Sequence, residues 1–407
     1  MAGPTSRITR VNVEGPLGPF VDAFTAQLRA SGYTALSIVN ELRQVAHLSR
    51  WLMTKELAAS DVSVARLEEF LVERRERSGH KACSLQSLLL FRAVMVAAGA
   101  VTESGETVRP LLPVEVLLGR FLRYLLAERG LSSGTAEAYV ARARRFVARC
   151  CVDGDVRALT AADVTGAVRA EAARVSVGST QYFVAGVRSF LRFCFIDGLI
   201  AVDLADAALA VTGRRGSSLP RGISDKDAAA LLASCDRRRS DGRRDYAILL
   251  VLLRLGLRAG EVARLSLDDI DWRAGDIAVH GKGRRLDRLP LPTDVGAAIV
   301  GYLKRGRPDL TDERAVFLRR LAPIGPLGRG GVACVVRRAC HRAGLPEIGP
   351  HRLRHTLACQ MVTAGVGLSG IARVLRHQGV TTTAIYARVD IAALTEVARP
   401  WPTRGAA

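Results

Sequence analysis

The stretch "RDYAILLVLLRLGLRAGEVARL", residues 244–265, decides the fold of the C-terminal half of the chain. Its long apolar run predicts a buried helix, and the Gly256-Leu257 pair breaks that helix before a second one begins. Arg258 stands at this second start, where backbone N–H groups and its guanidinium can face one anion together. Glu261 lies on the same helical face and can hold the arginine in place, although such a pair alone is more often an ordinary surface ion pair.

A β-hairpin is predicted after these helices. The segment "DIAVHGKGRRLDRLPLP", residues 276–292, alternates apolar and polar residues and turns on glycines. Lys282 lies between two of the glycines at the tip, where it can reach into a groove. Further helices are expected over residues 329–343, 351–364, 368–376 and 382–396. The C-terminal half is therefore expected to be mainly α-helical with a small β-sheet.

The segment "HRLRH" places His351, Arg354 and His355 at helical spacings that bring them to one face, with Leu353 directed elsewhere. Two histidines four residues apart also raise the possibility of zinc. The glutamate of an HExxH site is missing, and no clustered carboxylate or thiol completes a ligand set, so no metal site is expected.

The N-terminal half is predicted to hold two helical bundles that resemble each other. The segment "LAASDVSVARLEEFLVERR" aligns with "LTAADVTGAVRAEAAR", and Gly99 and Gly198 fall at matching ends. This pattern predicts a duplicated four-helix unit, although any two amphipathic bundles share some likeness. The segment "TGRRGSSLPRG" between the bundles and the C-terminal half shows neither the helical nor the strand periodicity of apolar residues. It is expected to be a linker. The expected domains are residues 1–106, 107–211 and 223–407, with the linker at 212–222.

The charge of the chain indicates a polyanionic partner. Its 407 residues carry a formal net charge of +20, with a pI near 10.6. Nucleic acid is the simplest such partner. A membrane surface is the rival, but there is no run of about 18 apolar residues, no signal peptide and no polybasic tail, so no membrane association is expected. The eight cysteines form no CxxC pair and are expected to be free thiols in a reducing cytoplasm.

The residues singled out so far occur in a recognisable order. Arg258, Lys282, His351-x-x-Arg354, His377 and Tyr386 follow one another along the chain. Together with "GLRAGEV", "GKGRR…LPLP" and "H…TTAIY", this order resembles the tyrosine recombinase (phage integrase) family over residues 220–395. The helices upstream resemble the family's core DNA-binding domain, here present twice.

The resemblance implies site-specific recombination of double-stranded DNA. Arg258 and Arg354 would neutralise the non-bridging oxygens of the phosphodiester, because a guanidinium is a bidentate and permanently charged clamp. Tyr386 would be the nucleophile, with its pKa lowered by the arginines and with His351 as proton acceptor. His377 would add a hydrogen bond to the phosphate. Lys282 would protonate the departing 5′ oxygen.

The same resemblance implies how the reaction is organised. The product would be a 3′-phosphotyrosyl link and a free 5′ hydroxyl, formed without ATP, metal or any other cofactor. The family acts as a homotetramer on two DNA sites, in some cases with a related recombinase or an accessory protein, and the tail "IAALTEVARPWP" would pack onto a neighbouring protomer. The expected location is the bacterial cytoplasm, at the nucleoid. A non-cleaving DNA-binding regulator and a type IB topoisomerase are the alternatives.

Three positions depart from the family pattern without removing a chemical group. Arg376 replaces the usual Gly before the last histidine, Leu255 replaces a Thr, and Arg388 replaces a His. Arg376 matters most, since its side chain could repack the turn or contact DNA.

Overall fold

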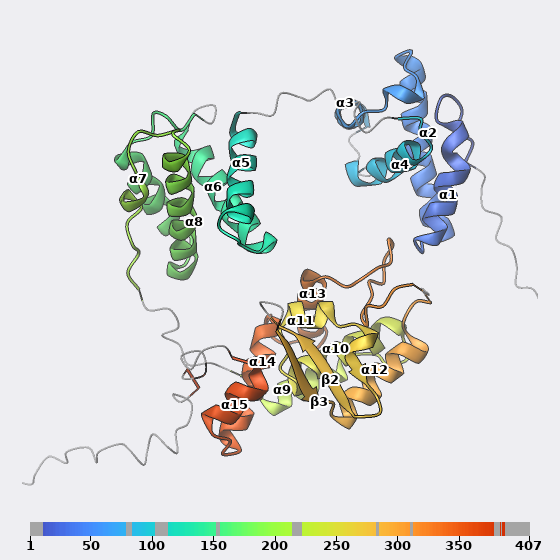
Figure 1. Cartoon of the computed structure of the whole chain (residues 1–407). Helices are drawn as coiled ribbons and strands as arrows, with labels where there is room; N and C mark the ends of the chain where they lie inside the picture. The colour runs from blue at the N-terminus through green and yellow to red at the C-terminus, as the bar shows by residue number, and fades with distance from the viewer. Residues whose placement is uncertain are drawn as a thin grey trace, which may run out of the picture. The chain divides into compact units, whose positions relative to one another are not determined.

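A computed structural model describes residues 11–78, 84–101, 113–151, 155–213, 222–281, 285–309, 312–377, 383, 385 and 386. Within these residues the chain forms three hydrophobic cores, one in each of two helical bundles and one in the C-terminal part, with a further small cluster around Tyr386. The helices of each part and the strands β2 and β3 are labelled in Figure 1. No helix among the described residues is both long and apolar enough to cross a membrane.

The first bundle consists of four helices. They are α1 (Val21–Ala30), α2 (Ala35–Thr54), α3 (Val64–Ser78) and α4 (Leu85–Ala97), with 3-10 turns at Gly18–Phe20 and Ala59–Asp61. Phe24 of α1 packs edge-on against Phe91 of α4, with ring centroids 5.0 Å apart. Thr34 begins α2 by accepting a hydrogen bond from the backbone N–H of Ser37.

The second bundle has the same number of helices. They are α5 (Pro113–Ala127), α6 (Ser133–Cys150), α7 (Ala161–Ala172) and α8 (Val177–Ile196), followed by a 3-10 turn at Ala205–Ala207. Phe121 of α5 packs edge-on against Phe190 of α8 at 5.3 Å. Phe190 also lies near Phe146 and Phe193, at 6.3 and 6.5 Å, so it stands at the centre of this core.

The two bundles share two local features. Each pairs a phenylalanine of its first helix with one of its fourth helix. Two residues after the end of each fourth helix stands a glycine with left-handed backbone, Gly99 at φ 71° and Gly198 at φ 70°. The N–H of the residue after each glycine bonds a carbonyl five residues earlier, which closes the helix in the same way. These features agree with the predicted duplication, which stays a prediction.

The C-terminal part surrounds a buried helix with other helices and a small sheet. Its helices are α9 (Asp225–Ala233), α10 (Ser240–Arg254), α11 (Ala259–Arg264), α12 (Thr293–Arg305), α13 (Arg329–Arg342), α14 (Pro350–Thr363) and α15 (Leu368–Leu375). The strands are β1 (Ile270–Asp271), β2 (Asp276–His280) and β3 (Leu286–Pro290), joined in that order and antiparallel throughout. In the register of β2 and β3, Ile277 faces Leu289.

Helix α10 is the centre of this part. Residues 247–253 are all buried, because the helix packs against α12, α13 and α14 on different sides. The uninterrupted apolar run in the sequence follows from this position, since a helix covered on several sides cannot carry a polar stripe.

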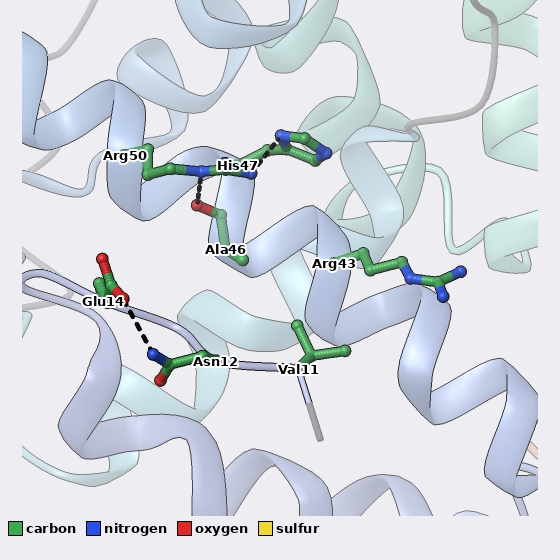
Figure 2. A pocket seen from close by; sticks show the side chains of 7 residues that line it. All are labelled: Val11, Asn12, Glu14, Arg43, Ala46, His47 and Arg50. Atoms are coloured by element: carbon green, nitrogen blue, oxygen red, sulfur yellow. Dashed lines mark hydrogen bonds between the residues drawn. The ribbon is translucent and has the colours of Figure 1, made fainter. Parts of the chain in front are cut away.

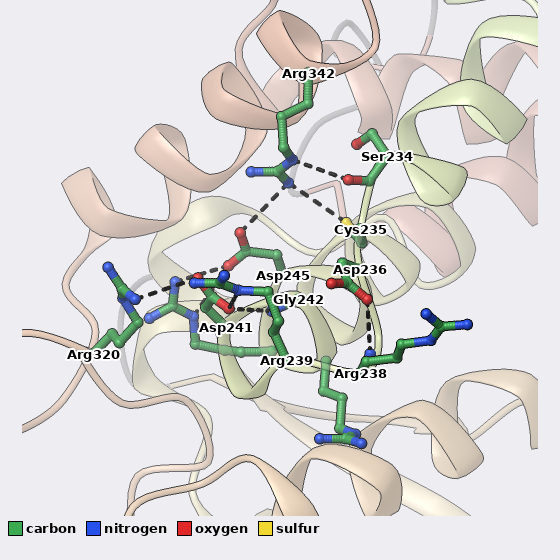
Figure 3. Close-up of polar contacts among 12 residues, drawn as sticks. Ser234, Cys235, Asp236, Arg238, Arg239, Asp241, Gly242, Asp245, Arg320 and Arg342 are labelled. Carbon is green, nitrogen blue, oxygen red and sulfur yellow. Dashed lines mark hydrogen bonds and ion pairs between the residues drawn. The ribbon is translucent and has the colours of Figure 1, made fainter.

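An ion-pair network fixes the start of α10 (Figure 3). Arg244 and Asp245 are both buried, with Nη2 of the arginine 2.8 Å from Oδ1 of the aspartate. Arg342 of α13 lies 3.6 Å from the other carboxylate oxygen and donates to the carbonyl of Ser234 after α9. The network therefore ties together α9, α10 and α13.

The mainly α-helical fold with a small sheet, predicted from the sequence, is confirmed. The helices expected over residues 329–343, 351–364 and 368–376 agree with α13, α14 and α15 to within one residue at each end. The hairpin of β2 and β3 is also as predicted, whereas α12 and the short β1 were not predicted. Most of the linker, the helix expected over 382–396 and the C-terminal tail lie outside the described residues. The seven described cysteines are free thiols.

We expect Phe190→Ala to destabilise the second bundle by about 3–5 kcal/mol, because it removes a ring at the centre of the core. Phe195→Ala is the matched control in the same helix, since Phe195 is 43% exposed and its loss should change stability by about 0.5 kcal/mol or less. Amide hydrogen exchange of α8 measures both effects. Equal effects of the two substitutions would contradict the assigned core.

Candidate active site

The site begins at the turn between α10 and α11. Gly256 has φ 57°, a left-handed conformation that a residue with a Cβ adopts only with strain. A Cβ there would also lie 2.9 Å from Leu375 and 3.0 Å from Leu357. Arg258 follows as the residue before the first turn of α11, with 43% of its side chain exposed. The Gly-Leu break of the sequence therefore places a solvent-facing guanidinium at a helix start.

Glu261 holds Arg258 through two contacts. One carboxylate oxygen accepts from Nη1 of Arg258 at 2.7 Å, and the other accepts from its backbone N–H at 2.8 Å. Burial acts to raise the pKa of Glu261, but the backbone hydrogen bond and the charges of Arg376 and Arg258 outweigh it and lower this pKa. The carboxylate is therefore ionised at neutral pH and fixes the start of α11.

Helix α14 brings the three residues of "HRLRH" to one side, as their spacing predicts. The rings of His351 and His355 have centroids 4.3 Å apart, while Leu353 points into the core. Arg354 is buried, and its guanidinium donates to the backbone carbonyls of Gly256 and Leu375. Burial, and then the neighbouring arginines, lower the pKa of Arg354 to about 9, so the group remains cationic at neutral pH.

Tyr386 lies against these histidines. Its phenol oxygen is 2.6 Å from Nδ1 of His355, and its ring is parallel to that of His377 with centroids 6.3 Å apart. A hydrogen bond with Thr383 orients the ring of His377, since Oγ1 of the threonine lies 2.7 Å from Nδ1 of the ring. The tyrosine and three histidines thus form one cluster, although 31 residues separate Tyr386 from His355 along the chain.

The expected lowering of the tyrosine pKa is wrong for the protein without DNA. Burial raises the pKa of Tyr386 to about 12, and the charge of Arg354 offsets only part of this effect. Burial and nearby positive charges also lower the pKa of His355 and of His377 to about 4, and they lower that of His351. All three imidazoles are therefore neutral at neutral pH, and the tyrosine is protonated.

The charges of the site favour a bound anion. Arg258, Arg354 and Arg376 act on one another electrostatically, with Glu261 as the carboxylate among them. The group therefore carries an excess of positive charge next to Tyr386, an arrangement that suits the phosphate of a phosphodiester.

Two residues of the site were not assigned a role from the sequence. His355, rather than His351, contacts the tyrosine hydroxyl, and its i+4 spacing from His351 was the available signal. Arg376 lies 2.8 Å from Glu261 instead of facing solvent, and its departure from the family's glycine was the signal there. Lys282 lies outside the described residues.

Other features of the described residues do not compete with this cluster. No group of three or more His, Cys, Asp or Glu side chains among them is arranged to hold a metal ion. A pocket in the first bundle lies between the segment of Val11, Asn12 and Glu14 and the α2 residues Arg43, Ala46, His47 and Arg50 (Figure 2). It contains none of the residues discussed above.

Comparison with known proteins matches this chain to integrases and recombinases. The phage integrase family model matches residues 222–392, and the model of the phage integrase N-terminal SAM-like domain matches residues 118–196. The putative integrase/recombinase y4rA of Sinorhizobium fredii is 40% identical over 396 residues, which cover 96% of this chain and 95% of that protein. The tyrosine recombinase XerD of Mycobacterium tuberculosis is 32% identical over 296 residues, 68% of this chain and 94% of that one.

A solved structure shares the fold. The XerH site-specific recombinase bound to its palindromic difH substrate, in a post-cleavage complex, aligns with a TM-score of 0.52 at 14% identity. The alignment covers 97% of this chain and 99% of that chain. At this identity the likeness concerns the fold alone.

We expect Gly256→Ala to destabilise the C-terminal part by about 1–2 kcal/mol or more, because the left-handed backbone becomes strained and the new Cβ meets Leu375 and Leu357. Gly301→Ala is the control, since Gly301 lies within α12 and a Cβ added there would meet open space, so this variant should gain about 0.4–1 kcal/mol. Chemical denaturation of both variants tests the difference. A neutral Gly256→Ala would contradict the close packing described here.

The neutral histidines predict a loss of stability in acid. Their pKa values of about 4 in the folded chain lie below the value of about 6.5 in the unfolded chain. The unfolded chain therefore binds more protons in this window, and the free energy of unfolding falls as the pH is lowered through it. His355→Gln should reduce the drop in melting temperature between about pH 7 and about pH 5, whereas the exposed His341→Gln should not. Identical drops in the two variants would contradict this assignment.

Proposed function

The chain belongs to the phage integrase family of tyrosine recombinases, and on that premise we propose that Tyr386 is the nucleophile of a DNA strand-transfer reaction. The chain is a site-specific DNA recombinase. The observation that carries the proposal is the hydrogen-bonded pair of Tyr386 and His355, next to the buried Arg354. A hydroxyl with an adjacent neutral base and a cation in reach is the arrangement that nucleophilic catalysis requires.

The chemical step transfers a phosphoryl group from one oxygen to another. A bond forms between phosphorus and the phenol oxygen of Tyr386, and the bond from phosphorus to the 5′ oxygen breaks. The result is a 3′-phosphotyrosyl link and a free 5′ hydroxyl, from which rejoining can proceed without ATP. Arg258 and Arg354 stabilise the charge that develops on the non-bridging oxygens, and His377 donates a hydrogen bond to the same phosphate.

The proton of Tyr386 needs an acceptor, and we assign this role to His355. The sequence pointed to His351, but the tyrosine hydroxyl lies 2.6 Å from Nδ1 of His355. A phosphodiester bound beside these rings adds negative charge, which raises the pKa of His355 and makes it a stronger base. Lys282 remains our candidate for protonating the 5′ oxygen, on the strength of its place in the hairpin sequence.

The substrate is double-stranded DNA in this proposal, consistent with the net charge of +20 and with the difH-bound XerH structure that shares the fold. Binding should weaken steeply with salt, because phosphate contacts release counterions. We further propose a homotetramer on two DNA sites, with the tail after Tyr386 packed on a neighbouring protomer, acting at the nucleoid in the bacterial cytoplasm. The first bundle would add a second DNA-contacting module of the same origin as residues 107–211.

We expect Tyr386→Phe to abolish covalent attachment to DNA while binding persists, because only the phenol oxygen is lost. The substrate is a nicked duplex built from the DNA that flanks the coding region, and the adduct is detected by denaturing electrophoresis. Tyr246→Phe is the control, since it loses a hydroxyl in the same part of the chain and should keep the adduct. A covalent adduct retained by Tyr386→Phe would rule out this tyrosine. Relaxation of supercoiled DNA without strand exchange would instead favour a topoisomerase.

A further inference from the structure

Arg376 has a backbone conformation that does not suit an arginine. It ends α15 with φ 55° and ψ 49°, in the left-handed region where glycine is the favoured residue. The neighbouring hydrogen bonds are those of an ordinary helix end, from its own N–H to Arg373 and from His377 to Ala372. The backbone alone therefore gives no reason for an arginine at this position, so the reason must lie in its side chain.

The side chain is directed inward and ends on Glu261. It is 3% exposed, as is the glutamate, and its Nη2 lies 2.8 Å from Oε2. Nη1 donates to the carbonyl of Val374 at 3.1 Å. An arginine buried to this degree is not placed to contact DNA. Of the two possibilities raised by the sequence, a DNA contact and a repacked turn, the structure therefore favours a role inside the protein.

Glu261 connects Arg376 to Arg258. Its two oxygens accept from Nη1 and the backbone N–H of Arg258 and from Nη2 of Arg376. The carboxylate is thus a bridge between α11, which begins after Arg258, and the end of α15, which leads directly to His377. We propose that Arg376 is a positioning residue: through Glu261 it holds Arg258 oriented toward the phosphate that Tyr386 attacks.

The balance of charges explains what Arg376 adds. A pair of Glu261 and Arg258 alone would be neutral, and a bound phosphate would compete with the glutamate for the guanidinium of Arg258. With Arg376 present, the three groups carry a net positive charge, and Glu261 keeps a second, buried partner while Arg258 also contacts the phosphate. Preorganised cations of this kind stabilise a transition state without rearranging during the reaction. This inference rests on the proposed function of Arg258 and Tyr386.

The decisive variant is Arg376→Gly, because glycine suits the left-handed backbone and should keep the helix end intact. We expect the single-turnover rate of covalent complex formation at saturating DNA to fall roughly tenfold to a hundredfold, since a small misplacement of a catalytic group has effects of this size. The dissociation constant for DNA should stay within about threefold of the wild type, because loss of a positioning contact acts on the chemical step. Arg376→Lys, which keeps the charge, should recover part of the rate.

Two controls separate positioning from other roles. Arg373→Ala removes an exposed positive charge from the same helix and should leave the saturating rate unchanged. In a Glu261→Gln background, Arg376→Gly should have a much smaller effect, because the two residues act through one contact.

Each outcome distinguishes the inference from the proposed function. Wild-type protein that forms no adduct at Tyr386 would contradict the proposed function and, with it, this inference. An adduct formed at equal rates by wild type and Arg376→Gly would overturn the inference alone. A defect of Arg376→Gly that disappears in excess DNA would also overturn the inference, because it would indicate a direct DNA contact. If Arg376→Lys were as slow as Arg376→Gly, Arg376 would act through packing only, and the inference would again be overturned.

Discussion

The buried guanidinium of Arg354 is the interaction on which the site depends. A buried charge is costly unless its hydrogen bonds are satisfied, and Arg354 is satisfied by the backbone carbonyls of Gly256 and Leu375. These carbonyls belong to the turn after α10 and to the end of α15. One side chain of α14 therefore fixes the segments that lead to Arg258 on one side and to His377 on the other.

The site holds Tyr386 in its protonated form. Tyr386 is buried and protonated, its pKa raised to about 12, and it shares a hydrogen bond with a neutral His355. The arginines around it carry more positive charge than Glu261 balances. In the proposed reaction, the negative charge of a phosphodiester would balance this excess of positive charge.

Local patterns predicted much of the fold. Three patterns each predict a local backbone geometry: the apolar run of α10, the Gly-Leu break, and the i, i+3 and i+4 spacing in "HRLRH". The structure agrees with all three. Helix α12 was not predicted, although its buried face is regular. The likeness of the two bundles extends to their Phe24–Phe91 and Phe121–Phe190 pairs.

Contacts between distant segments could not be predicted in this way. The pairing of Arg376 with Glu261 joins residues 115 positions apart, and that of Tyr386 with His355 joins residues 31 apart. Periodicity carries no information about such pairs. The choice between His351 and His355 depends on how the tyrosine enters the cluster, and the pKa of Tyr386 depends on its burial, which only the folded chain defines.

Tyr386, Arg258 and Arg354 are proposed to converge on one phosphate of duplex DNA. Mass spectrometry of the DNA-linked peptide, recovered by protease digestion after the full chain has reacted with a nicked duplex, tests this most directly. We expect the nucleotide to be attached through its 3′ phosphate to the peptide that contains Tyr386. Attachment to another residue, or through a 5′ phosphate, would contradict it.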